Sequence, residues 1–316
     1  MSRDRDLLVG SLVALFAASC FGTLGPLSRF AADAGVGALG FVAWRAGLGA
    51  VVLAVAVTVA RRDVGSIRRL ARGGRLALAL AIAMGASLNL AIFAAFGRIP
   101  IAIALVLFYT YPAMVTVVGL VLGHEPPTPA RLAALALASL GVVLVLAGGI
   151  DPAEGLAIDP LGVALGLTAA VCQTVFVTIS RHRYDVVPSD VATMLILGGG
   201  SFAAIGLAVA TGAAADLPGP LDAPSAWPFV LIAGTLGAAV SSLLFLWAIR
   251  RIGGVRTGIL MLFEPAVGTV LAAALLGQPL RAVQVAGGVL VLAAAVLVQV
   301  GPASEPSLPE DTALVA

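Results

Sequence analysis

Long apolar stretches, separated by short polar ones, follow one another along the whole chain. Ten of them reach the length of about 20 residues that a helix needs to cross the hydrocarbon core of a bilayer. Their apolar residues do not alternate with polar ones, as they would in the strands of a membrane β-barrel. The pattern predicts ten transmembrane helices, at residues 7–28, 38–60, 75–97, 100–123, 130–149, 160–180, 189–211, 226–249, 254–277 and 281–301.

The composition of the chain agrees with a membrane location. Hydrophobic residues make up 60% of the chain and charged residues 11%, and the mean hydropathy is +1.10. Soluble domains carry roughly a quarter charged residues, so this chain has too few polar side chains to cover a water-soluble surface. We predict an all-α membrane protein whose first helix is retained, because no cleavage site follows the charged start MSRDRDLLVG. Cys20 and Cys172 lie in apolar stretches and predict no disulfide.

The basic residues are unevenly distributed among the polar loops. All 18 are arginines; fourteen lie in loops on the side of the N-terminus, three lie on the other side, and Arg45 falls inside a helix. Because basic residues favour the cytoplasmic side, both termini are predicted to face the cytoplasm, in a bacterial inner membrane. We interpret the segment RRDVGSIRRLARGGR as a topology anchor near anionic headgroups and expect no nucleic-acid partner. The Pro- and acid-rich tail at 302–316 predicts disorder.

The two halves of the chain are copies of one unit. A shift of 153 residues, from Pro112 to Pro265, brings RIPIAIALVLFYTYPAMVTVVGLVLGHE onto RIGGVRTGILMLFEPAVGTVLAAALLGQ without a gap. The shift predicts two five-helix repeats, at residues 7–149 and 158–301. Five is an odd number, so the second copy enters the membrane from the opposite side. Two inverted halves around a mid-membrane site are a recurring design of secondary transporters, in which the halves exchange conformations.

The paired segments YPAMVTVVGLVLGHE and FEPAVGTVLAAALLGQ, together with WRAGLGAVVLA in the second helix, resemble the EamA-like family of the drug/metabolite transporter superfamily. The resemblance covers residues 7 to 301. It implies a ten-helix bacterial transporter of small metabolites, with export of solutes such as amino acids as the expected activity. Two departures from the family concern charge. Gln278 stands where the first copy has Glu125, and the apolar first helix, SLVALFAASCFGTLGPLSRF, contains no acidic residue. The related small multidrug exporters use a glutamate in their first helix for proton and cation exchange, so its absence here argues against cationic drugs as substrates.

Two ionisable residues lie inside the predicted helices, where charges are costly and mark functional candidates. Glu264 is the repeat partner of Tyr111, and each of the two directly precedes a proline in the middle of a helix. The prolines leave the carbonyls of Phe108 and Met261 without their helical donors, and such carbonyls are tolerated at this depth against protein or a wet cavity.

We therefore expect a central substrate cavity, with Tyr111 and Glu264 as polar contacts and the prolines as flexible points. Alternatively, Glu264 is a structural acid bonded to a neighbouring helix, and Arg45 caps carbonyls instead of meeting Glu264 or a substrate carboxylate. Tyr109 is expected to point away from the face of Tyr111 and to pack. The expected cavity residues are Phe108, Tyr111, Pro112, Thr257, Met261, Glu264, Pro265, Arg45, Asn89, Gln173 and Ser242.

The sequence contains no catalytic, metal or cofactor motif. His124 and His182 are too few for a metal site, and the absence of a phosphate-binding Gly-Lys-Ser/Thr loop excludes ATP-driven pumping of the P-loop type. We predict a non-enzymatic, secondary-active transporter without cofactors, driven by exchange or by ions such as protons. Its expected partners are a small-molecule substrate and membrane lipids, and homodimer formation is left open. An intramembrane enzyme acting on lipid-like substrates and a passive channel are the alternatives.

Overall fold

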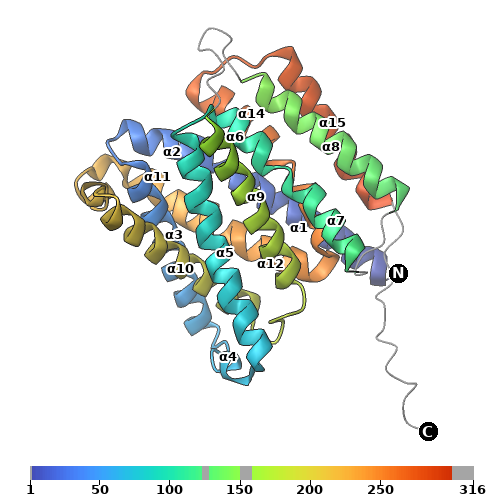
Figure 1. Ribbon diagram of the computed structural model, residues 1–316, viewed down its shortest axis with the longest axis horizontal. Coiled ribbons are helices and arrows are strands. Elements are labelled where there is room, and N and C mark those ends of the chain that lie inside the picture. Colours follow the sequence, from blue (N-terminus) through green and yellow to red (C-terminus); the bar gives the residue numbers. More distant parts are fainter. Residues whose placement is uncertain (1, 123–127, 150–158, 301–316) are drawn as a thin grey trace.

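Helices are the only regular elements in the part of the chain that the computed structural model describes, residues 2–122, 128–149 and 159–300. The predicted disordered tail, and Glu125 in the first repeat, lie outside these residues. The α-helices are α1 Ser2–Gly22, α2 Leu24–Asp33, α3 Ala38–Val59, α4 Ser66–Arg69, α5 Arg72–Phe96, α6 Ile101–Phe108, α7 Tyr111–Val121, α8 Pro129–Ala147, α9 Pro160–Ser180, α10 Ser189–Ala210, α11 Trp227–Gly234, α12 Ser241–Ile252, α13 Gly254–Met261, α14 Glu264–Leu276 and α15 Ala282–Val300 (Figure 1).

Nine helical stretches of the described chain are long and apolar enough to cross a membrane, and they coincide with the first nine predicted segments. The tenth predicted segment, 281–301, is helix α15, whose described apolar part Ala282–Val298 is shorter than the other nine. The structure therefore agrees with a multi-pass helical bundle, and a count of ten crossings stays a prediction.

The structure divides three of the predicted helices. The segment 7–28 breaks between α1 and α2, 100–123 breaks between α6 and α7, and 254–277 breaks between α13 and α14. In addition, a π-helical turn, Thr235–Val240, joins α11 to α12 inside the segment 226–249. All four segments are apolar on both sides of the interruption, so the apolar pattern alone could not place it.

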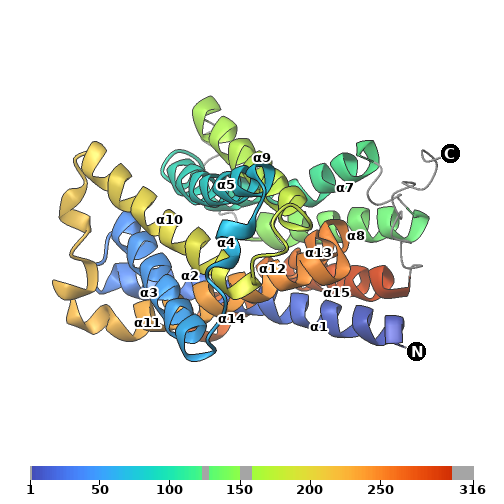
Figure 2. The ribbon, with the colours of Figure 1, turned by 90° about the horizontal axis from the view of Figure 1, so that it is seen from below.

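The repeat is visible in the helix boundaries. A shift of 153 residues carries α6 onto α13 and α8 onto α15, end for end, and carries α3 onto α10 within two residues. The main packing pairs obey the same relation. Helix α8 packs on its own repeat partner α15, and α3 packs on its own repeat partner α10. Helix α5 packs on α9, and their repeat partners α12 and α1 pack on each other in the same way. Figures 1 and 2 show α8 and α15 side by side along one edge of the bundle, with α3 and α10 at the other.

Equivalent loops lie at opposite ends of the bundle. Arg98 forms an ion pair of 2.9 Å with Asp159, at the beginning of α9. Its repeat partner Arg251 binds Asp6, at 2.6 Å, and the neighbouring Arg250 donates to the Tyr184 carbonyl just beyond the end of α9. The two halves are thus inverted relative to each other. We call the end that carries loops 60–71, 181–188 and 250–254 the arginine-rich end, which the sequence predicts to be cytoplasmic.

Aromatic and small side chains fix the opposite end. The Trp44 indole donates to the Leu217 carbonyl at 2.8 Å and packs edge-on against Trp227, with ring centroids 5.4 Å apart. Gly219 has a φ of +50° and lies so close to Trp44 that a Cβ there would meet the indole at 2.8 Å. The 211–226 loop of the second repeat is therefore anchored to the helix α3 of the first repeat.

Candidate functional site

Two helix breaks at equivalent positions define the centre of the bundle. Helix α6 ends at Phe108 and α7 begins at Tyr111; helix α13 ends at Met261 and α14 begins at Glu264. Pro112 and Pro265 are each the second residue of the following half-helix, where a missing N–H does not cost a hydrogen bond. The prolines thus begin new helices instead of bending continuous ones.

A buried hydrogen-bonded pair from α3 and α5 contributes the cation of this region. Arg45 is only 9% exposed, and its Nη2 donates to Asn89 Oδ1 at 2.6 Å. Asn89 in turn donates its Nδ2 to the Gly85 carbonyl at 2.8 Å, which fixes the orientation of its amide. The guanidinium is therefore held by a second side chain and does not reach the outer interface, as an isolated arginine at this depth would.

The anion of the region is Glu264, the first residue of α14. Its half-buried carboxylate lies within hydrogen-bonding reach of the Tyr109 hydroxyl and interacts electrostatically with Arg45. A carboxylate at the beginning of a helix is also stabilised by the helix dipole and by backbone N–H groups that lack helical acceptors. The break before α14 therefore brings the Glu264 carboxylate into electrostatic interaction with Arg45 of α3, within the membrane-spanning helices.

Aromatic residues and an amide complete the group. The Tyr111 side chain is 2% exposed, and its hydroxyl is within hydrogen-bonding reach of Gln173 of α9, which is 7% exposed. The Phe108 ring contacts both neighbouring tyrosines, with centroids 5.1 Å from Tyr109 and 5.3 Å from Tyr111. We call Arg45, Asn89, Tyr109, Tyr111, Gln173 and Glu264 the central polar cluster.

Four other predicted cavity residues do not belong to the central polar cluster. Thr257 is fully buried, and its hydroxyl donates to the Gly253 carbonyl of its own helix at 2.7 Å. Met261 is 3% exposed and belongs to the apolar core, and Pro112 lies against Gly258. Ser242 is half-buried in the first turn of α12, next to the π-helical turn, and the structure shows no bond between it and the cluster.

Tyr109 is the residue of the cluster that sequence reasoning missed. Steps of 100° along a continuous helix direct it away from Tyr111. The chain leaves the helix at Tyr109, which begins the turn between α6 and α7, so this angular rule no longer applies there. Its hydroxyl faces Glu264, while its repeat partner Leu262 is fully buried and apolar. The sequence did offer one signal, because Tyr109 lies three residues before Pro112, where a helix break could turn its side chain.

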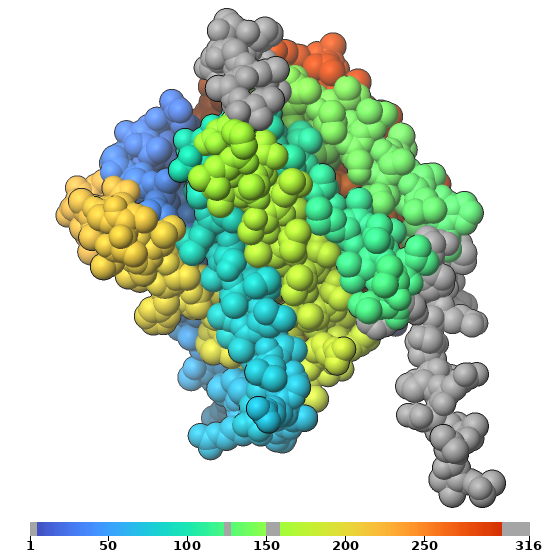
Figure 3. Space-filling view, in the orientation of Figure 1, coloured from blue at the N-terminus to red at the C-terminus, as the bar shows by residue number. Residues whose placement is uncertain are grey.

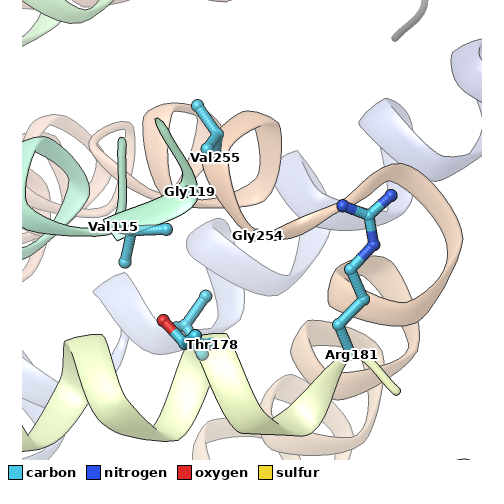
Figure 4. A pocket seen from close by; sticks show the side chains of 7 residues that line it. Val115, Gly119, Thr178, Arg181, Gly254 and Val255 are labelled. Carbon is cyan, nitrogen blue, oxygen red and sulfur yellow. The ribbon is translucent and has the colours of Figure 1, made fainter. Parts of the chain in front are cut away.

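A small pocket lies apart from the cluster. It has a volume of about 30 Å³ and opens at the arginine-rich end, between α7, α9 and α13. Its lining residues are Val115, Gly119, Val177, Thr178, Arg181, Gly254 and Val255 (Figure 4). Within the described residues, no group of three or more His, Cys, Asp or Glu side chains could hold a metal ion.

The comparisons with known proteins agree with this architecture, which is that of a helical membrane transporter built from two repeats. The sequence model of the EamA-like transporter family matches residues 8–147 and 160–300. The chain belongs to this family. No curated protein matches it. Among the solved structures, one titled "Crystal structure of protein" aligns with a TM-score of 0.73 and 18% identity, over 92% of this chain and 97% of the other, which shows a shared fold.

Proposed function

We propose that the protein is a secondary-active transporter that exports small metabolites such as amino acids across the bacterial inner membrane, by alternating access between its two halves. Membership of the EamA-like transporter family and the inverted repeats support transport. The observation that carries the substrate class is the placing of a single guanidinium and a single carboxylate, Arg45 and Glu264, in one cluster between broken helices.

The charges of the cluster favour a substrate that carries both signs. Removing one partner of a buried ion pair is strongly destabilising, because the remaining charge is left uncompensated. A substrate with an ammonium and a carboxylate supplies Glu264 with a cation and Arg45 with an anion at the same time. A purely cationic or anionic substrate leaves one of the two without a partner. The α-amino acids are small zwitterions of this kind.

Arg45 and Glu264, which attract each other electrostatically, also give the central polar cluster of the empty transporter no net charge. A cluster with no net charge can pass through an occluded state at lower electrostatic cost than one with an unpaired ion. We therefore propose exchange, or coupling to a proton gradient, as the driving force; neither requires a nucleotide or a cofactor.

Transport in proteoliposomes tests the proposal. The purified chain is loaded with unlabelled amino acids, and the uptake of labelled ones is followed, with and without a pH gradient. Saturable uptake that needs the internal substrate identifies a carrier, whereas unsaturable flux that follows the membrane potential identifies a channel and overturns the proposal. Direction is tested separately, by comparing intracellular and extracellular amino-acid levels in cells that express the chain.

The variant Glu264→Gln gives the residue-level test, with Gly206→Ala as the matched control on the exposed face of α10, where a Cβ meets no atom within 4 Å. We expect Glu264→Gln to reduce exchange at least roughly tenfold, the effect of losing one charged contact in a buried site. If Glu264→Gln and the control transport at the same rate over the whole pH range, Glu264 is a structural acid.

A further inference from the structure

The half-helices α6 and α13 are equivalent in the repeat but not in their surroundings. All eight residues of α13 are buried, whereas Ala104 alone is buried among the eight residues of α6. Ile101, the repeat partner of the buried Gly254, is 57% exposed. The two copies therefore occupy different packing states in one structure, at opposite ends of the bundle.

Helix α13 is covered by α7 at the arginine-rich end. A Cβ on Gly254 would lie 2.8 Å from Val177 Cγ1 and 3.5 Å from Val115 Cγ1; one on Gly258 would lie 3.4 Å from Pro112 Cβ. The half-helices approach this closely because α13 presents glycines where α7 presents larger side chains. We call this contact the α7–α13 seam; the pocket of Figure 4 lies at its end.

The repeat-related contact, between α6 and α14, is at most marginal, and each of the two half-helices packs mainly on other helices. Only Pro265 and Ala266 of α14 are buried, while the equivalent helix α7 has four buried residues. Gly268, the repeat partner of Val115, faces α1, where a Cβ would lie 3.4 Å from the Gly22 carbonyl oxygen. Helix α6 packs on α9, and α14 packs on α1 and α2.

The residues that would meet in a contact between α6 and α14 are nevertheless complementary in size, with the glycine on α14, the half-helix of the second repeat. In the α7–α13 seam, Gly254 of the second repeat receives Val115 of the first. The shift of 153 residues turns this pair into Ile101 of the first repeat and Gly268 of the second. In both pairs a glycine opposes a β-branched residue, so either contact can close without a steric clash.

We propose that α6 and α14 form a second gate that closes with Ile101 against Gly268 when the α7–α13 seam opens. The present structure is then the state that is sealed at the arginine-rich end and unsealed between α6 and α14. The inference rests on the alternating access proposed above and assigns the two contacts that alternate. Val177 of α9 also packs against Gly254 in the α7–α13 seam. Its repeat partner is Leu24, at the beginning of α2.

Pairs of cysteines test the two gates directly, in the full-length chain in liposomes and in a Cys20→Ala/Cys172→Ala background. Gly119→Cys with Val255→Cys reports the α7–α13 seam, since both residues line the same pocket. The repeat-equivalent pair, Ala272→Cys with Ala102→Cys, reports the second gate and leaves Gly268 free to receive Ile101. Gly119→Cys with Ala102→Cys is the control, because seventeen residues of one broken helix separate these positions by about 25 Å, beyond a short cross-linker.

A wedge in the first seam shifts the balance between the two states. Gly254→Val and Gly258→Leu each add a side chain where the seam has no room. We expect either substitution to lower cross-linking of the first pair and to raise that of the second pair, changing their ratio roughly tenfold, as a modest overpacking penalty on one of two states does. Gly206→Ala, in open space, should leave the ratio unchanged.

Two results would overturn the proposal. The first is that the second pair fails to cross-link in both wedge variants although they elute as folded, monodisperse protein. The second is that both pairs cross-link together in the same molecules. Spin-label distances at the second pair, measured in the unwedged chain and in whichever wedge variant folds, provide an independent reading: one long distance in both samples also overturns the proposal. These measurements need no substrate, so a failure here is separate from a failure of the proposed transport of amino acids.

Discussion

The charged residues of the cluster are each held by a neutral neighbour. Asn89 holds the Arg45 guanidinium at 2.6 Å, and the Tyr109 hydroxyl faces the Glu264 carboxylate. Such neutral partners orient a charge without cancelling it. The two repeats differ at these positions, since Leu262 and Tyr111 are the counterparts of Tyr109 and Glu264.

Removal of the Tyr109 hydroxyl tests this arrangement. Tyr109→Phe keeps the ring in the core but takes away the group that faces Glu264. We expect transport to fall roughly tenfold or more, because a hydrogen bond to a charged group contributes about 1.5–3 kcal/mol and each 1.4 kcal/mol is about a factor of ten. In the Glu264→Gln background the same substitution should have little further effect, since the carboxylate that it positions is absent. Additive losses in the double variant would show that the two residues act separately.

At the scale of elements, close helix packing depends on particular glycines. A Cβ on Gly141 of α8 would lie 2.6 Å from the carbonyl oxygen of Gly287 on α15, and one on Gly287 would lie 2.5 Å from the Gly141 oxygen. These are backbone contacts that no side-chain rearrangement relieves. The pairing of the last helices of the two repeats is therefore set by two facing glycines.

Gly141→Leu should destabilise the bundle. The added side chain has to force α8 and α15 apart, which costs about 1–3 kcal/mol as overpacking does in other cores. The measurement is the temperature of unfolding in detergent, followed by loss of monodispersity. Gly206→Leu, on an exposed face of α10, is the matched control and should unfold at the temperature of the unsubstituted chain.

The beginning of α9 adds a dependence on pH. Asp159 accepts from the Leu161 N–H at 2.9 Å, and the Arg98 guanidinium, together with this N–H, holds the pKa of its carboxyl below the usual value. A depressed carboxyl pKa contributes stability that is present above the pKa of the unfolded chain and is lost as the pH falls through the pKa of the folded state. We expect Asp159→Asn to lower the unfolding temperature at pH 7, and the difference to shrink as the pH falls through the folded pKa of Asp159, below which this carboxyl is protonated in the folded and the unfolded chain alike. A difference that stays constant over the whole acid range would contradict the ion pair as its cause.

For the whole molecule, the arginine distribution and the inverted halves lead to one topology. Loops 60–71, 181–188 and 250–254 meet at one end, through the Arg62–Asp190 pair at 2.9 Å and the bonds of Arg250 to the Val187 and Tyr184 carbonyls. Figure 3 shows α5 and α9 passing along one face of the molecule between the two ends. The positive-inside rule predicts that the arginine-rich end faces the cytoplasm.

Reporter fusions test this topology. A cytoplasmic reporter should be active when fused after residue 65 or residue 253, and a periplasmic one when fused after residue 97 or residue 212. The reversed pattern would show that the whole bundle is inverted in the membrane. A mixed pattern along the chain would contradict the assignment of the spans.

The sequence determined the membrane location, the helical class, the family and the repeat, because each of these is written in local composition or in a direct comparison of one half with the other. It also pointed to Glu264, Arg45 and the two proline sites, since charges and prolines stand out in an apolar segment. Their partners depended on tertiary structure. Asn89 reaches Arg45 from another helix, and Tyr109 turns toward Glu264 because the helix ends there, which periodicity cannot foresee.

The packing of the two halves was decided by tertiary structure alone. Both repeats carry the same break, and the sequence gives α6 and α13 equivalent positions, yet α13 is buried and α6 is not. Symmetry in sequence permits two arrangements of nearly equal energy, and one chain can occupy only one of them at a time. Which of the two half-helices is buried is therefore a property of the folded state.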